Sequence, residues 1–300
     1  MRVNPNIASD ILADMQQSQA TLNTALEEVA TGKRVTKPSD DPVASSSMVQ
    51  NTIATANVDQ YTKNVSSELS MVQTADSALS SVVSSLTRAV SLGTEGANGT
   101  TNASNLQAIA NEVQGILSSV VALANTSYSG TYLFSGTETT TAPYTADSAS
   151  SSGYTYNGNG GVNSVAIGDD ATIQVNLPGS QLFSNSSANV LGSLSSLVTA
   201  LKSGNASDIE SATSAVSGAL NYVDQQRVFY GNAASQLDSQ ETYLSQEKVN
   251  LTSQEDSLIA VDESQAATLL TQAETANSAA AAAAAKVLPE TILNYLATPS

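Results

Sequence analysis

The amino-acid sequence predicts a mainly α-helical protein: an elongated antiparallel helical bundle or coiled coil with paired N- and C-terminal helices and a small β-rich insertion domain. Two observations lead to this class. Apolar or small residues recur every three or four positions over most of the chain, which is the heptad spacing of a helix that lies along another helix. One stretch near the middle of the chain lacks this spacing and is rich in glycine and aromatic residues.

The composition suits long, thin packing rather than a thick core. Aromatic residues make up 4% of the chain, and there is no Trp, so little side-chain bulk is present. The net charge of -17, with 10 Lys and Arg, argues against nucleic acid as a partner and against docking on an anionic membrane. We expect no apolar run long enough to span a bilayer, and therefore no membrane partner.

The chain has neither Cys nor His. The commonest general base, the Cys nucleophile and the preferred zinc ligands are therefore missing, and we expect no catalytic residue, cofactor or metal. The joint absence also favours a protein that works outside the cell without disulfides. Since the N-terminus has no apolar h-region, we expect export without a cleaved signal peptide.

The first predicted helix begins at Ile7 and ends before Gly32, the expected C′ residue. One stripe of the helix is apolar or small and is widened by Leu12 and Leu26. It consists of Ile11, Met15, Ser18, Leu22, Ala25 and Val29. Together with the following loop, this helix forms a predicted N-terminal assembly segment, residues 1–42.

The loop at 32–43 holds two prolines, three basic residues and an Asp pair. In one interpretation it is a solvated turn in which Ser39 or Asp40 caps the next helix, with Pro42 near the first helical position. In the other it is a contact loop between subunits. The contact residues would be Lys33, Arg34, Asp40 and Asp41.

The N-terminal half of the rod is predicted at 43–127. Its first helix should run from Pro42 to Leu92, because the glycine cluster at 93–99 is expected to break it. Asp76 is the one member that does not fit the apolar stripe, and it could be paired, exposed or a register device. A further helix follows, with Leu106, Ile109, Val113, Ile116, Val120 and Leu123 on one face.

The β-rich insertion is predicted at 128–187. Seven of the thirteen aromatic residues lie between positions 128 and 183. Strands are expected around 132–134, 154–156, 162–167 and 172–177; Asn157-Gly158 is a hairpin signal, and Asp169-Asp170 should form a turn between strands. The tyrosines could be the core of the insertion or a binding patch, and the core is the more common use of such residues.

The C-terminal half of the rod is predicted at 188–258 and the C-terminal assembly helix at 259–300. A short helix carries Leu191, Leu194, Val198 and Leu201. The heptad spacing then continues over 209–287 with one stutter after Leu251, which would relax supercoiling without ending the helix. A helix of about 79 residues would be roughly 118 Å long.

The N- and C-terminal stripes are the natural partners of each other. Both are poor in side-chain bulk, so we expect them to gain stability against copies of the same chain. The predicted assembly residues are Ile11, Met15, Leu22, Leu26, Val29, Leu269, Ala273, Ala276, Leu293 and Leu296.

Several motifs resemble the flagellin-like family and, within it, the hook-filament junction proteins. The most specific are TGKRVTKPSDDPV at 31–43 and YLFSGT at 132–137. The other matching segments are 73–79, 96–100, 156–158, 167–169 and 292–296. The resemblance covers nearly the whole chain.

The resemblance implies an axial subunit of the bacterial flagellum, located outside the cell and polymerised through its termini. It implies a ring of copies between a neighbouring junction protein and flagellin, and an export chaperone at the C-terminal helix. The pure alanine run at 279–285 is a departure from the junction proteins, and the segment 287–293 resembles a flagellin C-terminus, so a filament flagellin is the alternative. A filament-forming surface or adhesive protein is a further one.

An enzyme is the least favoured class. The carboxylate pairs Asp40-Asp41 and Asp169-Asp170 have no accompanying His, Cys or glycine-rich phosphate loop. Gly32-Lys33 lacks the upstream glycine of a phosphate-binding loop.

Overall fold

The computed structural model describes the backbone of residues 7–98 and 101–296 and the side chains of residues 9–98 and 101–286. The chain divides into two compact units. The terminal unit comprises residues 1–56 and 248–300, and the central unit comprises residues 57–247. Helices α2 (Pro42–Ala97) and α6 (Ala206–Ile259) contribute to both units.

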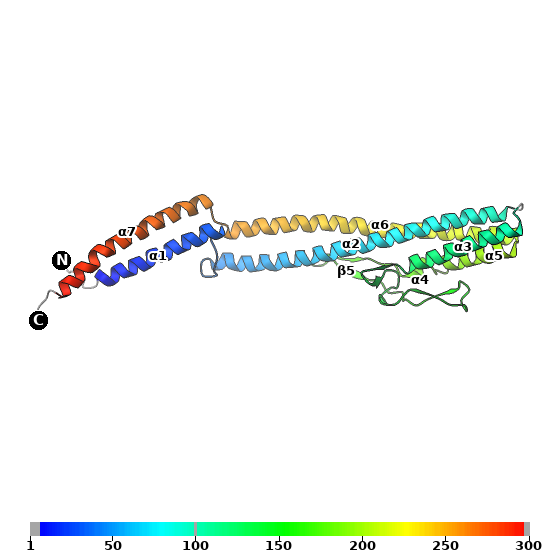
Figure 1. The fold of residues 1–300 in the computed structure, drawn as a ribbon, viewed down its shortest axis with the longest axis horizontal. Helices are drawn as coiled ribbons and strands as arrows, with labels where there is room; N and C mark the ends of the chain where they lie inside the picture. The colour runs from blue at the N-terminus through cyan, green and yellow to red at the C-terminus, as the bar shows by residue number, and fades with distance from the viewer. Residues whose placement is uncertain (1–6, 99–100, 297–300) are drawn as a thin grey trace. The chain divides into compact units, whose positions relative to one another are not determined.

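In the terminal unit, α1 (Ile7–Thr31) and α7 (Glu263–Leu296) pack side by side (Figure 1). Small buried residues, including Ala25, Ala266 and Ala273, let the two backbones approach closely. Gly32 has a φ of 67°, and its N–H donates to the Glu28 carbonyl at 2.9 Å. The predicted end of the first helix and the pairing of the terminal helices are confirmed.

The prediction of one continuous helix over 209–287 is wrong, because α6 ends at Ile259 and α7 begins at Glu263. Two local interactions favour the break over a stutter. The Asp262 Oδ1 atom caps α7 by accepting the backbone N–H groups of Ser264 and Gln265. The chain before it leaves the helix to pair with the α1–α2 loop, through an antiparallel bridge between Lys33 and Ala260.

In the central unit, α2 and α6 run antiparallel, and α3 (Ala103–Ala124) and α5 (Val190–Ser203) pack beside them (Figure 1). Arg88 of α2 pairs with Glu112 of α3 at 2.8 Å. The predicted apolar stripes are largely buried here. Their fully enclosed members include Val65, Val72, Leu79, Leu86, Val113, Val120, Leu194, Ile209, Val216, Val223 and Leu237.

Asp76, the residue that did not fit the α2 stripe, is paired. Its two carboxylate oxygens accept hydrogen bonds from Arg227 Nε and Nη2 of α6, at 3.0 and 3.1 Å. The hydrogen bond to Asp76 raises the pKa of Arg227. This two-point contact fits only one alignment of α2 against α6.

The glycine cluster does not end α2 where predicted, since the helix continues through Gly93 and Gly96 to Ala97. A Cβ at Gly93 would overlap the Thr213 side chain of α6, and one at Gly96 would overlap Leu201 of α5. These glycines therefore allow close helix packing, which outweighs their low helix propensity.

The expectation that no segment is long and apolar enough to span a bilayer is not met by helix α3. Its length and mean hydropathy of 1.2 are enough for a membrane span, although we expected no such segment. Its apolar face, which includes Leu106, Ile109 and Val113, is buried in the central unit. The composition of α3 is thus also that of a helix inside a bundle.

The β insertion consists of three two-stranded antiparallel pairs and a short helix, α4 (Gly179–Leu182). The strands are β1 (Ser127–Tyr128), β2 (Thr131–Tyr132), β3 (Tyr144–Ala146), β4 (Tyr154–Tyr156), β5 (Ser164–Ala166) and β6 (Thr172–Gln174). Asp169 and Asp170 lie in the β5–β6 turn, as predicted. Asn157-Gly158 is not a hairpin turn, because β4 pairs with the preceding strand, β3.

The core of the insertion is aromatic and is completed by a residue of α6. Phe134 contacts Phe183 and Tyr230 edge-on, with ring centroids 5.4 and 6.5 Å apart, and all three rings are buried. The hydroxyl of Tyr230 accepts the Leu177 backbone N–H at 3.1 Å. Burial raises the pKa of Tyr230 and of Tyr144, which also lies in this cluster. The interpretation of these aromatics as core is confirmed for the buried ones.

Candidate assembly site

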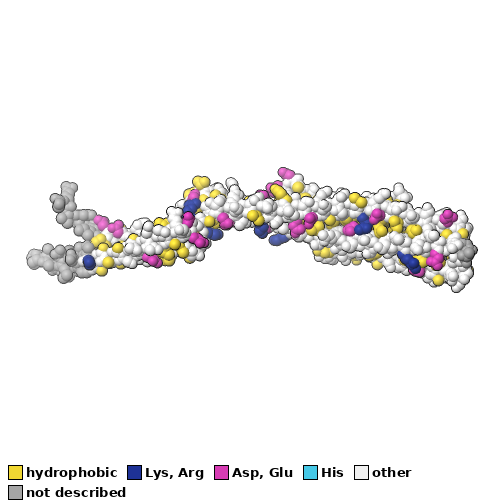
Figure 2. Space-filling model, turned by 90° about the horizontal axis from the view of Figure 1, so that it is seen from above, with side chains coloured by type: hydrophobic (Ala, Val, Ile, Leu, Met, Phe, Trp, Pro, Cys, Tyr) yellow, Lys and Arg dark blue, Asp and Glu magenta, His cyan; other side chains and the backbone are white. Residues whose placement is uncertain are grey.

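Exposed apolar side chains gather in the terminal unit. Among the described residues, eight of the eleven large hydrophobic side chains that are exposed belong to it. The eight are Leu12, Leu26, Val29, Val43, Val49, Ile53, Val249 and Leu269. Figure 2 shows how hydrophobic side chains lie open among polar and acidic ones. Such a concentration is typical of an interaction surface.

The predicted assembly residues of α1 share one apolar stripe but differ in exposure. Ile11, Met15 and Leu22 are half-buried. Leu26 and Val29 are exposed although α7 packs against the helix. Helix α7 therefore leaves part of the apolar stripe of α1 uncovered.

The predicted assembly residues of α7 also differ in exposure. Ala273 is buried, while Leu269 and Ala276 are exposed. Leu293 and Leu296 lie outside the residues whose side chains are described.

The contact loop predicted at 32–43 is shorter in the structure, residues 32–41, because α2 begins at Pro42, and it is bonded within its own chain. Its backbone is tied to the end of α6 by Arg34 N–H donating to Ile259 at 2.7 Å and Val261 N–H donating to Gly32 at 3.0 Å. Arg34 Nη2 also donates to the Leu258 carbonyl at 3.1 Å. Val35 forms a small core with Ala44, Ile259, Met48 and Leu258. No pattern along the chain predicted this contact between the loop and the end of α6, because the two segments are far apart in sequence.

Asp40 and Asp41 in the loop accept hydrogen bonds from different parts of the backbone. Asp40 Oδ2 accepts the backbone N–H groups of Lys37 at 2.8 Å and Thr36 at 3.2 Å, which closes the turn. Asp41 Oδ1 accepts those of Ala44 at 3.0 Å and Val43 at 3.2 Å, so Asp41 caps α2. The expectation that Ser39 or Asp40 is the cap is wrong by one residue or more, whereas Pro42 is the first residue of α2 as predicted.

These hydrogen bonds stabilise the ionised carboxylates. The pKa of Asp41 is lowered, first by the bond from Ala44 and further by Arg34, whose Nη2 lies 3.4 Å from Oδ2. The pKa of Asp40 is lowered mainly by the bond from the Lys37 backbone.

We expect Asp41→Asn to reduce the acid sensitivity of the terminal unit. Since the folded-state pKa of Asp41 lies below its ordinary value of 3.8, its charge stabilises the fold above that value, and this contribution is lost as pH falls through the folded-state pKa. Asn keeps a capping oxygen but does not titrate. Thermal melts by circular dichroism at pH 7 and pH 3 should show a smaller difference for the variant, and an unchanged difference would contradict the assignment.

A pocket of about 430 Å³ opens between the loop, the end of α1 and the start of α2. Val35, Pro38, Met48 and Val49 supply apolar surface. The full lining is Glu27, Thr31, Lys33, Val35, Thr36, Lys37, Pro38, Ser45, Met48, Val49 and Thr52. We call it the loop pocket.

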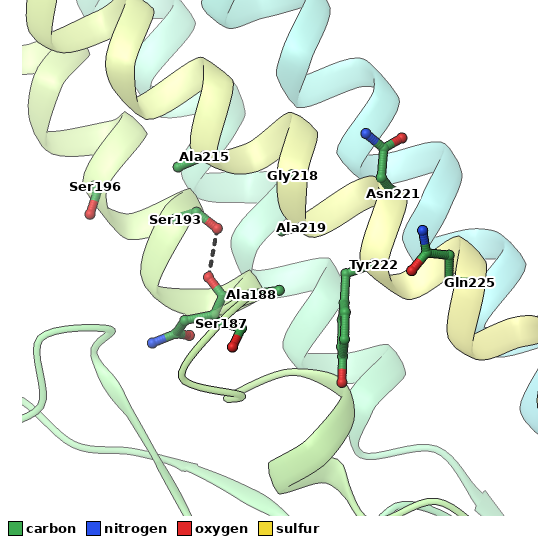
Figure 3. Close-up of a pocket in the computed structure, with 11 residues that line it drawn as sticks. Ser187, Ala188, Ser193, Ser196, Ala215, Gly218, Ala219, Asn221, Tyr222 and Gln225 are labelled. Atoms are coloured by element: carbon green, nitrogen blue, oxygen red, sulfur yellow. Dashed lines mark hydrogen bonds between the residues drawn. The ribbon is translucent and has the colours of Figure 1, made fainter.

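A second hollow, of about 520 Å³, lies between α5 and α6 in the central unit (Figure 3). Its lining has no charged residue, and small residues such as Ala215 and Gly218 form part of its wall. Tyr222 is held there by its hydroxyl, which donates to the Gln181 carbonyl at 3.0 Å and accepts from Asn185 Nδ2 at 3.1 Å. This groove lacks the charge and the exposed apolar bulk of the terminal unit.

Among the described residues, no three acidic side chains come together in a way that could hold a metal ion. The loop carboxylates are instead engaged with backbone N–H groups, as described above.

Residues 3–139 match the family model of the bacterial flagellin N-terminal helical region. A search of curated proteins finds no match. Among solved structures, the chain is similar to a flagellar hook-associated protein of Vibrio parahaemolyticus, with 22% identity, a TM-score of 0.67, and coverage of 74% of this chain and 100% of that one.

Two junction proteins are also similar. FlgL of Bacillus cereus is 25% identical with a TM-score of 0.60, over 69% of this chain and 99% of that one. The flagellar junction protein FlgL of Legionella pneumophila is 14% identical with a TM-score of 0.60, over 71% and 100%. Residues 3–139 of the chain thus match the flagellin N-terminal helical region, and the fold is similar to that of flagellar hook-associated and junction proteins.

Proposed function

We propose that the protein is an axial subunit of the bacterial flagellum that forms the junction ring between hook and filament. The observation that carries this proposal is the gathering of exposed apolar side chains in the terminal unit. Together with the likeness to junction proteins, it supports assembly through the two ends of the chain.

In this proposal, α1 and α7 form a tube with the same helices of other copies. Leu26, Val29, Leu269 and Ala276 are available for contacts between copies because they are exposed beside the α1–α7 pair. Ala273 and the half-buried Ile11, Met15 and Leu22 hold the pair together. Leu293 and Leu296, the other predicted assembly residues of α7, lie outside the residues whose side chains are described.

The loop at 32–41 is proposed as a second contact region. Arg34, Asp40 and Asp41 keep it in shape through their bonds within the chain. Lys33 and Lys37 are exposed and carry positive charge on an otherwise acidic protein. The remaining proposed partners are a neighbouring junction protein on one side, flagellin on the other and an export chaperone at α7. In this proposal the subunit acts outside the cell.

Seeded assembly of the purified chain tests this function. Flagellar fragments that end in the hook serve as seeds. They are incubated with the protein and examined by electron microscopy. A junction subunit adds one layer and then stops. Continued elongation would identify a filament flagellin instead, and failure to add to any seed would contradict the axial role.

A further inference from the structure

We propose that neighbouring copies contact each other through two opposite faces of the α2–α6 pair in the terminal unit. The α2 outer face, comprising Val49, Thr52 and Ile53 beside the loop pocket, would pack against the α6 outer face, comprising Val249 and Asp256, of a second copy. This inference rests on the assembly proposed above and adds a second surface that joins the copies, in addition to α1 and α7.

The α2 outer face is apolar although it points away from the core. Val49 and Ile53 are one helical turn apart and 60% and 58% exposed. The residues that face α6, such as Ala44, Asn51 and Val58, are buried on the opposite side of the helix. Two β-branched apolar side chains in adjacent turns of an exposed face are costly in water unless another surface covers them.

The α6 outer face has the same character. Val249 is 59% exposed and lies away from the buried Leu244 and Leu251, which face α2. Asp256 follows seven residues later, two turns along the same stripe, and is exposed. The chain therefore presents an apolar side chain on each side of the pair.

A hydrogen bond fixes how α2 and α6 are aligned along their axes, and so which of these residues lie at the same level. Asn51 Nδ2 donates to the Leu251 carbonyl at 2.8 Å. Because α2 and α6 are antiparallel, Ile53 lies at about the level of Val249, and Asp256 lies about 10 Å further towards the loop pocket. Two copies placed side by side at equal height would thus bring Val249 to Ile53 and Asp256 to the pocket rim.

The charges at that rim suit Asp256. Lys33 and Lys37 line the loop pocket. Lys37 is held only by Glu27 at 3.8 Å, in a pair whose side chains are 66% and 43% exposed, and Lys33 makes no ion pair with the described side chains. Such weak surface pairing leaves both cations free to meet a carboxylate of another copy. An acidic chain has few other places where two lysines lie together.

The two faces are different, so the contact between them is heterologous. Each copy offers one face of each kind, and repeated contacts form a ring or a helix rather than a closed dimer. The surface thus fits a second copy of this chain better than a single foreign partner.

Cross-linking tests the pairing because the natural chain has no Cys. The double variant Ile53→Cys/Val249→Cys is assembled on seeds and treated with a short bifunctional maleimide. A ladder of linked chains longer than a dimer is expected. The control pair Ile53→Cys/Val228→Cys, which uses an equally exposed valine of the central unit, should give no ladder.

A charge exchange provides a second measurement. Lys33→Glu/Lys37→Glu should raise the concentration needed for assembly about tenfold, and adding Asp256→Lys should restore most of it. Assembly without a ladder and without rescue would overturn this inference while leaving the proposed function intact. Absence of assembly by the unmodified chain would overturn both.

Discussion

Tyr230→Ala is expected to lower the free energy of unfolding of the central unit by about 3–5 kcal/mol. The ring is buried between Phe134 and Phe229, and its hydroxyl accepts the Leu177 backbone N–H. Truncation would leave a cavity at the junction of α6 with the insertion and an unpaired backbone donor beside it. The insertion has only two-stranded pairs, so it depends on this contact with the helices.

Urea unfolding followed by near-ultraviolet circular dichroism measures this effect, because the chain has tyrosines but no Trp. Tyr230→Phe separates the ring from the hydroxyl and should cost about 1–3 kcal/mol, the penalty for an unsatisfied buried N–H. Equal losses for both variants would show that the hydroxyl, rather than ring packing, dominates. A loss below about 1 kcal/mol for the alanine variant would contradict the role of Tyr230 as an anchor.

Gly93→Ala is expected to destabilise the central unit by about 1–3 kcal/mol. In an ordinary helix interior the change would be favourable, since Ala is the better helix former. Here the new methyl group would overlap Thr213, whose hydroxyl already donates to the Ile209 carbonyl at 2.7 Å. A β-branched side chain held in this way has little freedom to move aside.

Gly115→Ala is the matched control for that prediction. Gly115 lies inside α3 with no atom near the position of an added Cβ, so the same substitution should stabilise by about 0.5–1 kcal/mol. Thermal melts of both variants give the sign directly. If Gly93→Ala also stabilises, close packing is not the reason for the glycine.

Much of the helical fold follows from local rules. The heptad spacing predicted α1, α2, α3 and α5 and the pairing of α1 with α7, because apolar stripes on long helices can be buried only against one another. The failures share one cause, which is that tertiary contacts outweighed a local signal. Gly93 and Gly96 look like helix breakers but serve packing, and the helix at Ile259 ends because its following residues bond to the loop after α1.

The candidate site was predictable to a smaller degree. The wide apolar stripe of α1 marked Leu26 and Val29, but the stripe could not show which members α7 covers. The outer faces at Ile53 and Val249 were missed because single exposed apolar residues on two separate helices form no pattern until the helices are aligned. Asn51 aligns the two helices, but nothing in the sequence distinguishes it from an ordinary polar residue on a helix surface.

The bond from Arg34 to the Leu258 carbonyl joins residues 224 positions apart. Closing so long a loop has an entropic cost, and contacts between residues far apart in sequence form slowly. The bond can form only after the chain has been made as far as Leu258. An α1 helix of 25 residues with a thin apolar stripe gains little stability by itself. We therefore expect α1 to become structured late in folding, once α7 is available to pack against it.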